Sequence, residues 1–279
     1  MKTAILTDTN SGIYAEEAEK LGIFVMPMPV IIEDETYYEG TNLTEEEFLD
    51  ALTSGKRVTT SQPALGDLLD TWDELLNEYD QVVYIPMSSG LSNSCHAAMA
   101  MAEEYEGRVV VVDNHRISVT LRQSVLTAKA MAMEEKSAEE IKLFLEAEAL
   151  RSSIYVSVNT LEYLKKGGRI TPAAAMVGSV LKLHPKIVVE DGAMHSTKKY
   201  RGNIRSAVLS YTKDMEEDLR RAQPDRVFIT HSGCAPEVVE PVRKYLESLG
   251  VFSEILETRA GGVVSSHCGP GTLGVLYIV

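Results

Sequence analysis

The segment "QVVYIPMSSGLSNSCHAAMA", residues 81–100, leads from an apolar run through a loop with four serines to an alanine-rich run. β-Branched and aromatic residues favour a strand at its start, and the alanines favour a helix at its end. Other strand candidates, "TAILT" at 3–7 and "RVVVVD" at 108–113, are also continuous apolar runs rather than alternating ones. Such runs are typical of a parallel sheet that helices cover on both faces. The sequence therefore predicts an α/β fold.

Further elements divide the chain in two. We expect a strand around 23–32, a helix after the capping box of Thr44 and Glu47 that ends near Gly55, a polar loop at 56–67, and a long helix over 118–133. After about residue 150, short strands with turns such as Asp191–Gly192 predominate. We predict a mostly parallel α/β domain at 1–152 and an α+β domain at 153–279, which share one ligand cleft.

Composition excludes several functional classes. The 279 residues include 27 Lys and Arg against 41 Asp and Glu, a formal charge of −14. Such a chain repels nucleic acid and anionic membrane surfaces. Neither a membrane-spanning apolar run nor a signal peptide is evident, which predicts a cytoplasmic protein that is not integral to a membrane. The three cysteines form no C-x-x-C pair, so we expect buried structural thiols and no metal.

Two clusters of hydroxyl side chains stand where strands lead into helices, "SSGLSNS" at 88–94 and "VTTSQP" at 58–63. Ser92 or Ser94 could cap the following helix, and a hydroxyl before Pro63 could cap another that Pro63 opens. Alternatively, the clusters form one cradle for an anion, because the carboxyl ends of strands and the amino ends of helices are common anion sites. The sequence leaves both interpretations open.

The second half carries glycines and basic residues together. In "LEYLKKGGRIT", Gly167 and Gly168 are expected to end a helix with positive φ, and Arg169 is either a solvated charge or an anion contact. In "HSTKKYRGNIRS", two lysines precede Arg201 and Arg205. A basic segment in an acidic protein suggests a phosphate-bearing or acidic partner, although solvated surface charges are the simpler interpretation.

The C-terminal "SSHCGPGTLGVLYIV" matches G-x-G-x-x-G at 269–274. The residues after it predict a strand, whereas a dinucleotide site needs a helix there, so we reject that function. The glycines more plausibly permit a close approach of the backbone at a cleft. His267 is then either a structural residue or a donor to a carboxylate.

Catalysis is a weaker alternative. The chain lacks G-x-S-x-G, H-E-x-x-H and P-loop motifs. A small-molecule hydrolase or transferase would need a Ser–His hydrogen bond, with a carboxylate to orient the histidine. The candidates are Ser89 and Ser92, His96, His231 and His267, and Asp8 and Asp113.

Six motifs in order, "ILTDTNSGI", "TTSQPA", "PMSSGLSNSCHAA", "VVVVDNHRIS", "TLEYLKKGGRI" and "HCGPGTLGVLY", span nearly the whole chain. Together they resemble the DegV family, the fatty-acid-binding subunits of bacterial fatty-acid kinase. The resemblance implies a two-domain DegV-like fold with a long-chain fatty acid in a tunnel between the domains. It also implies a lipid carrier that has no catalytic residues and no cofactor, and that presents the lipid carboxylate to a separate ATP-dependent kinase.

The resemblance also implies roles for individual residues. Thr60 and Ser92 correspond to the hydroxyls that hold the carboxylate, and Ser61 is their neighbour. His267 corresponds to a histidine near the carboxylate or the mouth that faces the kinase. Arg201 is expected near the same place.

By the same comparison, Arg201, Arg205 and Arg169 are candidates for partner docking or phosphate contact. Burial of the acyl chain would supply most of the affinity, because each buried CH₂ contributes roughly 0.8 kcal/mol.

Overall fold

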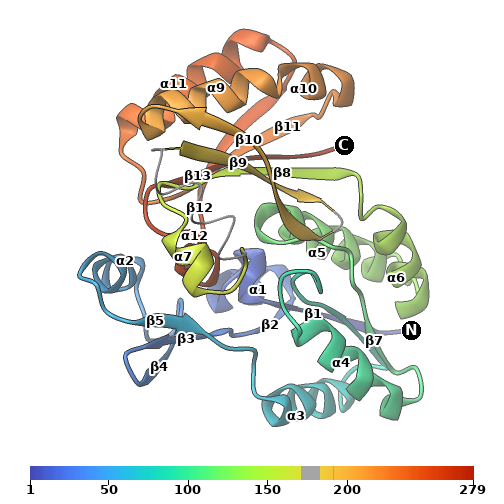
Figure 1. Ribbon diagram of the computed structural model, residues 1–279. Helices are drawn as coiled ribbons and strands as arrows, with labels where there is room; N and C mark the ends of the chain where they lie inside the picture. The colour runs from blue at the N-terminus through green and yellow to red at the C-terminus, as the bar shows by residue number, and fades with distance from the viewer. Residues whose placement is uncertain (171–182, 191) are drawn as a thin grey trace. The chain divides into compact units, whose positions relative to one another are not determined.

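The computed structural model describes residues 1–170, 183–190 and 192–279 (Figure 1). They form two compact units. Unit 1 contains residues 1–48, 57–150 and 192–193, and unit 2 contains 49–56, 151–170, 183–190 and 194–279. The sequence predicts a boundary between two independent domains after residue 152. The division into compact units does not test whether these domains are independent, so this boundary stays a prediction.

Four parallel strands form the main sheet of unit 1, in the order β2-β1-β6-β7. They are β1 (Thr3–Asp8), β2 (Phe24–Met26), β6 (Gln81–Ile85) and β7 (Val109–Val111). The predicted parallel sheet is thus confirmed. Because the chain moves from β1 to β2 on one side and later to β6 on the other, the carboxyl ends of β1 and β6 flank a topological switch point, where α/β proteins place ligands.

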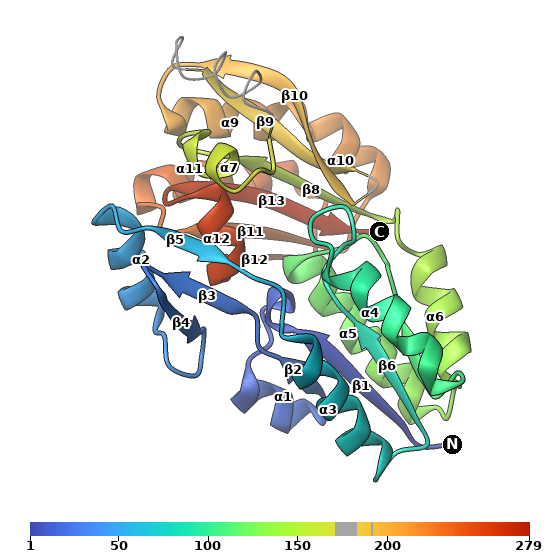
Figure 2. The ribbon, with the colours of Figure 1, turned by 60° about the horizontal axis from the view of Figure 1, so that its bottom comes forward.

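Helices cover both faces of this sheet, as the continuous apolar strands predict (Figure 2). On one face, Trp72 of α3 (Leu65–Leu76) and Cys95 of α4 (Ser94–Ala102) belong to a core with β1, β6 and β7. On the other face lie α5 (Ser118–Met133), with the predicted bounds, and α6 (Ala138–Ala147). Shorter elements are η1 (Thr9–Ser11), α1 (Ala15–Leu21) and η2 (Glu103–Tyr105).

A small antiparallel sheet in the order β4-β3-β5 corrects two predictions. Its strands are β3 (Pro29–Ile32), β4 (Glu35–Tyr38) and β5 (Val58–Thr60). The single strand expected at 23–32 is divided between two sheets, because Pro27 has no N–H for a ladder and the Met28 N–H is held by Thr9 Oγ1 at 3.1 Å. The loop expected at 56–67 contains β5, which pairs with β3.

Of the helix starts predicted at Thr44 and at Pro63, one is confirmed. Helix α2 (Glu45–Thr53) follows Thr44, whose N–H and hydroxyl both donate to Glu47 Oε2, at 2.9 and 2.7 Å, while Glu47 N–H donates to Thr44 Oγ1 at 3.3 Å. The other is wrong. Helix α3 begins after Ala64 without a side-chain cap, so Pro63 precedes the helix instead of opening it.

Six strands form the sheet of unit 2, in the order β10-β9-β8-β13-β11-β12. They are β8 (Ser152–Ser157), β9 (Leu183–Glu190), β10 (Ala193–Arg201), β11 (Arg226–Ser232), β12 (Glu254–Arg259) and β13 (Thr272–Ile278). β11 and β12 are parallel, whereas β13 is antiparallel to β8 and β11, which gives the mixed sheet of an α+β unit. Of the predicted turn residues between β9 and β10, Asp191 lies outside the described residues.

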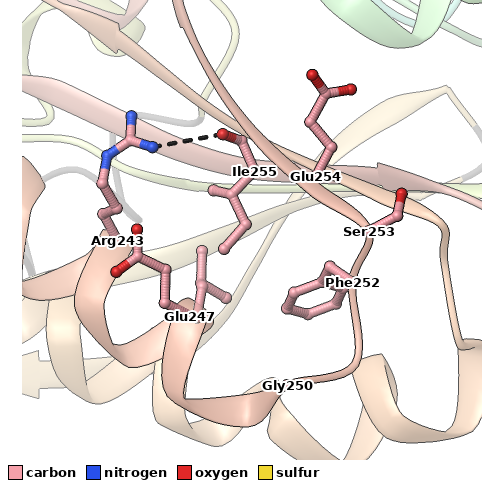
Figure 3. Close-up of a pocket in the computed structure, with 8 residues that line it drawn as sticks. Arg243, Glu247, Gly250, Phe252, Ser253, Glu254 and Ile255 are labelled. Carbon is pink, nitrogen blue, oxygen red and sulfur yellow. Dashed lines mark hydrogen bonds between the residues drawn. The ribbon is translucent and has the colours of Figure 1, made fainter.

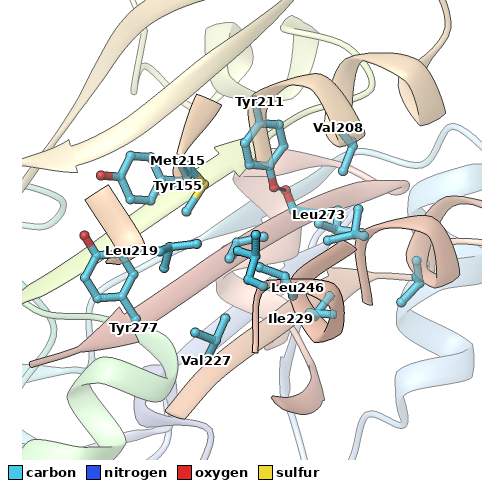
Figure 4. Packing of buried hydrophobic residues seen from close by; sticks show 14 of the residues in the cluster. Tyr155, Val208, Tyr211, Met215, Leu219, Val227, Ile229, Leu246, Leu273 and Tyr277 are labelled. Carbon is cyan, nitrogen blue, oxygen red and sulfur yellow. Dashed lines mark hydrogen bonds between the residues drawn. The ribbon is translucent and has the colours of Figure 1, made fainter. Parts of the chain in front are cut away.

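One face of this sheet carries the main core of unit 2 (Figure 4). Helices α9 (Ile204–Asp214), α10 (Glu216–Ala222) and α11 (Pro236–Leu249) pack there against alternate residues of the strands, such as Val227 and Ile229 of β11. Tyr211 is fully buried, and its hydroxyl donates to Leu273 O at 3.2 Å. The opposite face carries α7 (Glu162–Lys166) and α12 (Gly262–Cys268), which contact each other.

Candidate functional site

A buried carboxylate holds the hydroxyl loop that follows β6. Asp8, at the end of β1, accepts the N–H groups of Asn10 and Met87, each at 2.9 Å. Burial raises the pKa of Asp8 to about 6, against the lowering effect of these hydrogen bonds. Asp8 therefore joins the ends of β1 and β6 at the switch point. The signal in the sequence is the "TD" at the end of the first strand, where the catalytic alternative places a carboxylate that orients a histidine.

Ser92 lies half-buried in this loop. Its N–H donates to Ser88 O at 3.2 Å, and its hydroxyl donates to Ser94 Oγ at 3.1 Å and accepts the Ser94 N–H at 3.2 Å. The N-cap of α4 is Asn93, which makes no side-chain capping bond. Capping by Ser92 or Ser94 in the strict sense is therefore wrong, although the Ser92 hydroxyl satisfies the first N–H of the helix.

The second hydroxyl cluster ends the small sheet. Thr60 is the last residue of β5 and lies opposite Val30. Ser61 is exposed; its N–H donates to Pro29 O at 3.2 Å, and its hydroxyl donates to Gln62 O at 3.0 Å. Thr60, Ser61 and Ser92 thus belong to one unit, but Thr60 and Ser61 lie at the end of β5 in the small sheet, whereas Ser92 lies in the loop after β6 of the main sheet. That they bind one carboxylate stays a prediction.

In unit 2, His267 and Arg169 lie on either side of Gly167. A Cβ at Gly167 would fall 2.1 Å from His267 Nδ1, so only glycine permits this approach of α7 to α12. Arg169 Nη1 donates to Gly167 O at 2.5 Å. Gly168 has the predicted positive φ, +70°, but Gly167 has φ −76°, so the prediction for Gly167 is wrong. Its role is close approach, which no local pattern reveals.

The electrostatics of this place favour an anion. Burial and, to a smaller degree, the positive charge of Arg169 lower the pKa of His267 to about 4. His267 is therefore neutral near pH 7 and offers one N–H donor, while Arg169 supplies the positive charge. A carboxylate or phosphate oxygen suits this combination better than a cation does.

Each of these polar residues adjoins an apolar cluster between the sheet and helices α7 and α12, which we call the α7–α12 cluster. Ile170 follows Arg169, and Cys268 follows His267. Its buried members are Val158, Leu161, Leu164, Ile187 and Cys268, with Val156, Ile170, Met194 and Val264 partly buried against them. Unit 2 therefore places donors for an anion next to buried apolar side chains.

The close approach predicted for the C-terminal glycines is confirmed at Gly269. Its φ is +82°, and a Cβ there would lie 2.3 Å from the ring of Tyr163. Gly269 thus lets the end of α12 lie against α7.

Arg201 and Arg205 are exposed at the end of β10 and in the first turn of α9. Asn203 caps this helix by accepting the Ser206 N–H at 2.9 Å. Of the lysines before them, Lys198 forms a salt bridge with Asp214. A docking or phosphate-binding role for the two arginines stays a prediction.

Other expectations concern sulfur, metals and membranes. Cys95 and Cys268 are buried as predicted, but Cys234 is only partly buried; burial raises the pKa of each thiol to about 12. Over residues 1–170, 183–190 and 192–279, no three His, Cys, Asp or Glu side chains gather as metal ligands. Within the same ranges, no helix combines the length and apolar character needed to cross a bilayer.

The catalytic alternative predicts a Ser–His hydrogen bond. The Ser92 hydroxyl donates instead to Ser94. His231 Nδ1 accepts the Cys234 N–H at 3.2 Å, and its Nε2 lies 3.1 Å from Glu257. This buried histidine therefore orders the loop between β11 and α11.

The chain is similar to known proteins over nearly its whole length. Residues 2–279 match the family model described as "Uncharacterised protein, DegV family". A DegV domain-containing protein of Deinococcus radiodurans is 30% identical over 280 residues, which cover 99% of this chain and 98% of that protein.

Two solved structures are similar over the whole chain. A DegV family protein of Thermus thermophilus, described by its fatty-acid binding, has 30% identity and a TM-score of 0.86, with 100% of both chains covered. DegV of Bacillus subtilis, described as a fatty acid binding protein, has 27% identity and a TM-score of 0.85, with 100% of this chain and 99% of that one covered. The chain therefore belongs to the DegV family.

Proposed function

We propose that this protein binds a long-chain fatty acid and presents its carboxylate to a separate ATP-dependent kinase, without catalysing a reaction itself. The observation that carries the proposal is the position of His267 and Arg169 beside the α7–α12 cluster. An amphipathic ligand with one anionic end needs hydrogen-bond donors and a positive charge next to apolar side chains. The relatives from Thermus thermophilus and Bacillus subtilis, described as binding fatty acids, support this ligand class.

The proposal includes the prediction that Thr60 and Ser92, with Ser61 nearby, donate hydroxyl hydrogens to the carboxylate, together with His267. Hydrogen bonds to a charged acceptor are stronger than neutral ones, so hydroxyls can hold an anion without a full counter-charge. The acyl chain would lie against apolar surface in a tunnel between the two domains. Its burial contributes on the order of 10 kcal/mol before the cost of ordering the chain.

Native mass spectrometry of the purified protein, followed by denaturing release and identification of the ligand, tests lipid binding. We expect one fatty acid per chain, lost in Thr60→Ala/Ser92→Ala and retained in Ser210→Ala, a control on the exposed side of α9. A protein that is empty and takes up no added fatty acid would contradict the proposal. Ester hydrolysis that Ser92→Ala abolishes would favour the hydrolase alternative.

A matched pair of substitutions tests where the tail binds. Ile187 and Ile229 are both buried in the sheet of unit 2, but Ile187 belongs to the α7–α12 cluster and Ile229 to the core on the opposite face. Replacement of either by Ala should cost about 2–5 kcal/mol of stability. Only Ile187→Ala should also weaken the binding of a fluorescent fatty acid. Equal changes in Kd would show that the tail does not use this face.

The kinase step is the transfer of a phosphoryl group from ATP to a carboxylate oxygen, which gives an acyl phosphate and ADP. We propose that Arg201 and Arg205 contact the kinase or the phosphate, with Arg169 as a further candidate, and that the complex acts in the cytoplasm. Charge reversal in Arg201→Glu or Arg205→Glu should slow acyl-phosphate formation by an added kinase subunit while fatty-acid binding persists. Arg221→Glu on α10 is the control. Unchanged transfer in both variants would remove this part of the proposal.

A further inference from the structure

A pocket at one edge of unit 2 lies between the end of α11 and the start of β12 (Figure 3). Its volume is about 270 Å³, slightly below the range of pockets that hold drug-sized molecules. β12 runs parallel to β11, and the pocket lies at their amino ends. His267 lies in the helix that follows the carboxyl end of β12, so within unit 2 the pocket is separate from His267.

The pocket has an apolar floor and charged walls. Leu246, Phe252 and Ile255 supply the floor, and Leu246 is fully buried. Glu247 projects from α11, while Phe252 belongs to the segment that leads into β12, so the carboxylate and the ring come from opposite sides (Figure 3). A ligand between them would meet one charged and one aromatic group.

Most charges around the pocket are already paired. Arg243 donates to Ile255 O at 3.3 Å and to Glu257 Oε2 at 2.6 Å, and the latter bond is the main cause of the lowered pKa of Glu257. Glu254 lies 3.1 Å from Arg226. Glu247 is exposed and joins no salt bridge in the described part of the chain. One negative charge therefore remains over the apolar floor.

We propose that this pocket receives an arginine or lysine side chain of a partner protein. The apolar stem of such a residue would contact Phe252 and Ile255, and its charged end would pair with Glu247. The remaining negative charge disfavours a carboxylate or phosphate, and the volume admits one long side chain. An exposed ion pair contributes about 0–1 kcal/mol, so the contact forms one part of a larger interface and does not hold a free amine tightly.

NMR titration of the ¹⁵N-labelled full-length protein with N-acetyl-arginine methylamide tests the proposal. The citrulline analogue is the matched probe, because it has the same stem and no charge. We expect saturable shifts at the amides of Gly250 and Ser253 with a Kd in the millimolar range, and binding about fivefold weaker for citrulline, the factor that about 1 kcal/mol represents. Glu247→Gln should cause the same loss.

Glu237→Gln is the control, since Glu237 is exposed ten residues earlier on α11, about 15 Å along the axis. It should bind the arginine probe like the unaltered protein. Equal binding of both probes, unchanged binding by Glu247→Gln, or no shift at about 50 mM probe would overturn the proposal. A micromolar Kd would also overturn the proposal. A pocket that binds the free arginine derivative so tightly would be a site for a small cationic molecule, not for one side chain of a larger protein interface.

Discussion

Asp8 allows a quantitative test of how unit 1 is held together. Its carboxylate is fully buried and has a pKa of about 6, against 3.8 for the free group. Because the pKa in the folded state is raised, the folded protein binds more protons than the unfolded chain between about pH 4 and 6. Stability is therefore lost as the pH rises through this window. The difference between these two pKa values corresponds to about 3 kcal/mol of stability once the pH has crossed the whole window.

Asp8→Asn removes this titration. The amide also changes the hydrogen bonds to Met87 and Asn10, but that cost is independent of pH, so only the difference between two pH values is informative. Between about pH 4.5 and 7.5, the stability of the unaltered protein should fall by about 2 kcal/mol relative to Asp8→Asn. Urea denaturation monitors unit 1 through Trp72, the one tryptophan of the chain, which is fully buried in this unit.

Asp70→Asn, at an exposed position of α3, is the control and should show no such difference. A stability difference between Asp8→Asn and the unaltered protein that is the same at both pH values would refute the reasoning. It would mean that water or a local rearrangement solvates the Asp8 carboxylate.

Three further outcomes follow from the contacts described above. His267 has a lowered pKa of about 4, so the protein should lose stability as the pH falls from about 6.5 to 4, by up to about 3 kcal/mol. Thermal melts of His267→Gln should lack this pH-dependent loss of stability. Gly167→Ala places a methyl group 2.1 Å from His267 and should cost more stability in urea than Gly168→Ala, where only the positive φ is strained, at about 1 kcal/mol. Equal costs would contradict the close approach. Thr44→Ala should lower the free energy of unfolding by about 1 kcal/mol in denaturant titrations. No loss would show that the capping box does not stabilise the protein.

The sequence predicts well those features that depend on a few neighbouring residues. The continuous apolar runs at 3–7 and 81–85 predict parallel strands, and the pair Thr44 and Glu47 predicts the start of α2. The start of α2 depends on hydrogen bonds within one turn, and the parallel strands depend on burial on both faces of the sheet. Both causes leave their mark in the types of neighbouring residues.

Contacts between distant segments were not predictable in this way. Gly167 reads as a helix terminator, yet its lack of a side chain is required by His267, one hundred residues later. Thr60 reads as part of a loop because its pairing partner Val30 lies in another segment. Asp8 gains its raised pKa from burial under the loop that contains Met87. In each case the deciding energy comes from tertiary packing.

The charge of the chain makes the surroundings of Arg169 and His267 informative. With a formal charge of −14, the protein as a whole repels carboxylates, so the proposed binding of a fatty acid must depend on short-range donors. Arg169 supplies a permanent charge, while burial, and to a smaller degree this charge, lowers the pKa of His267 and keeps it neutral near pH 7. A bound carboxylate would offset the charge of Arg169, which is the smaller of the two causes of the lowered His267 pKa, and would accept a hydrogen bond from the neutral imidazole. A neutral histidine beside an arginine thus suits a ligand that brings its own negative charge, because the arginine supplies the opposite charge and the histidine supplies a hydrogen-bond donor.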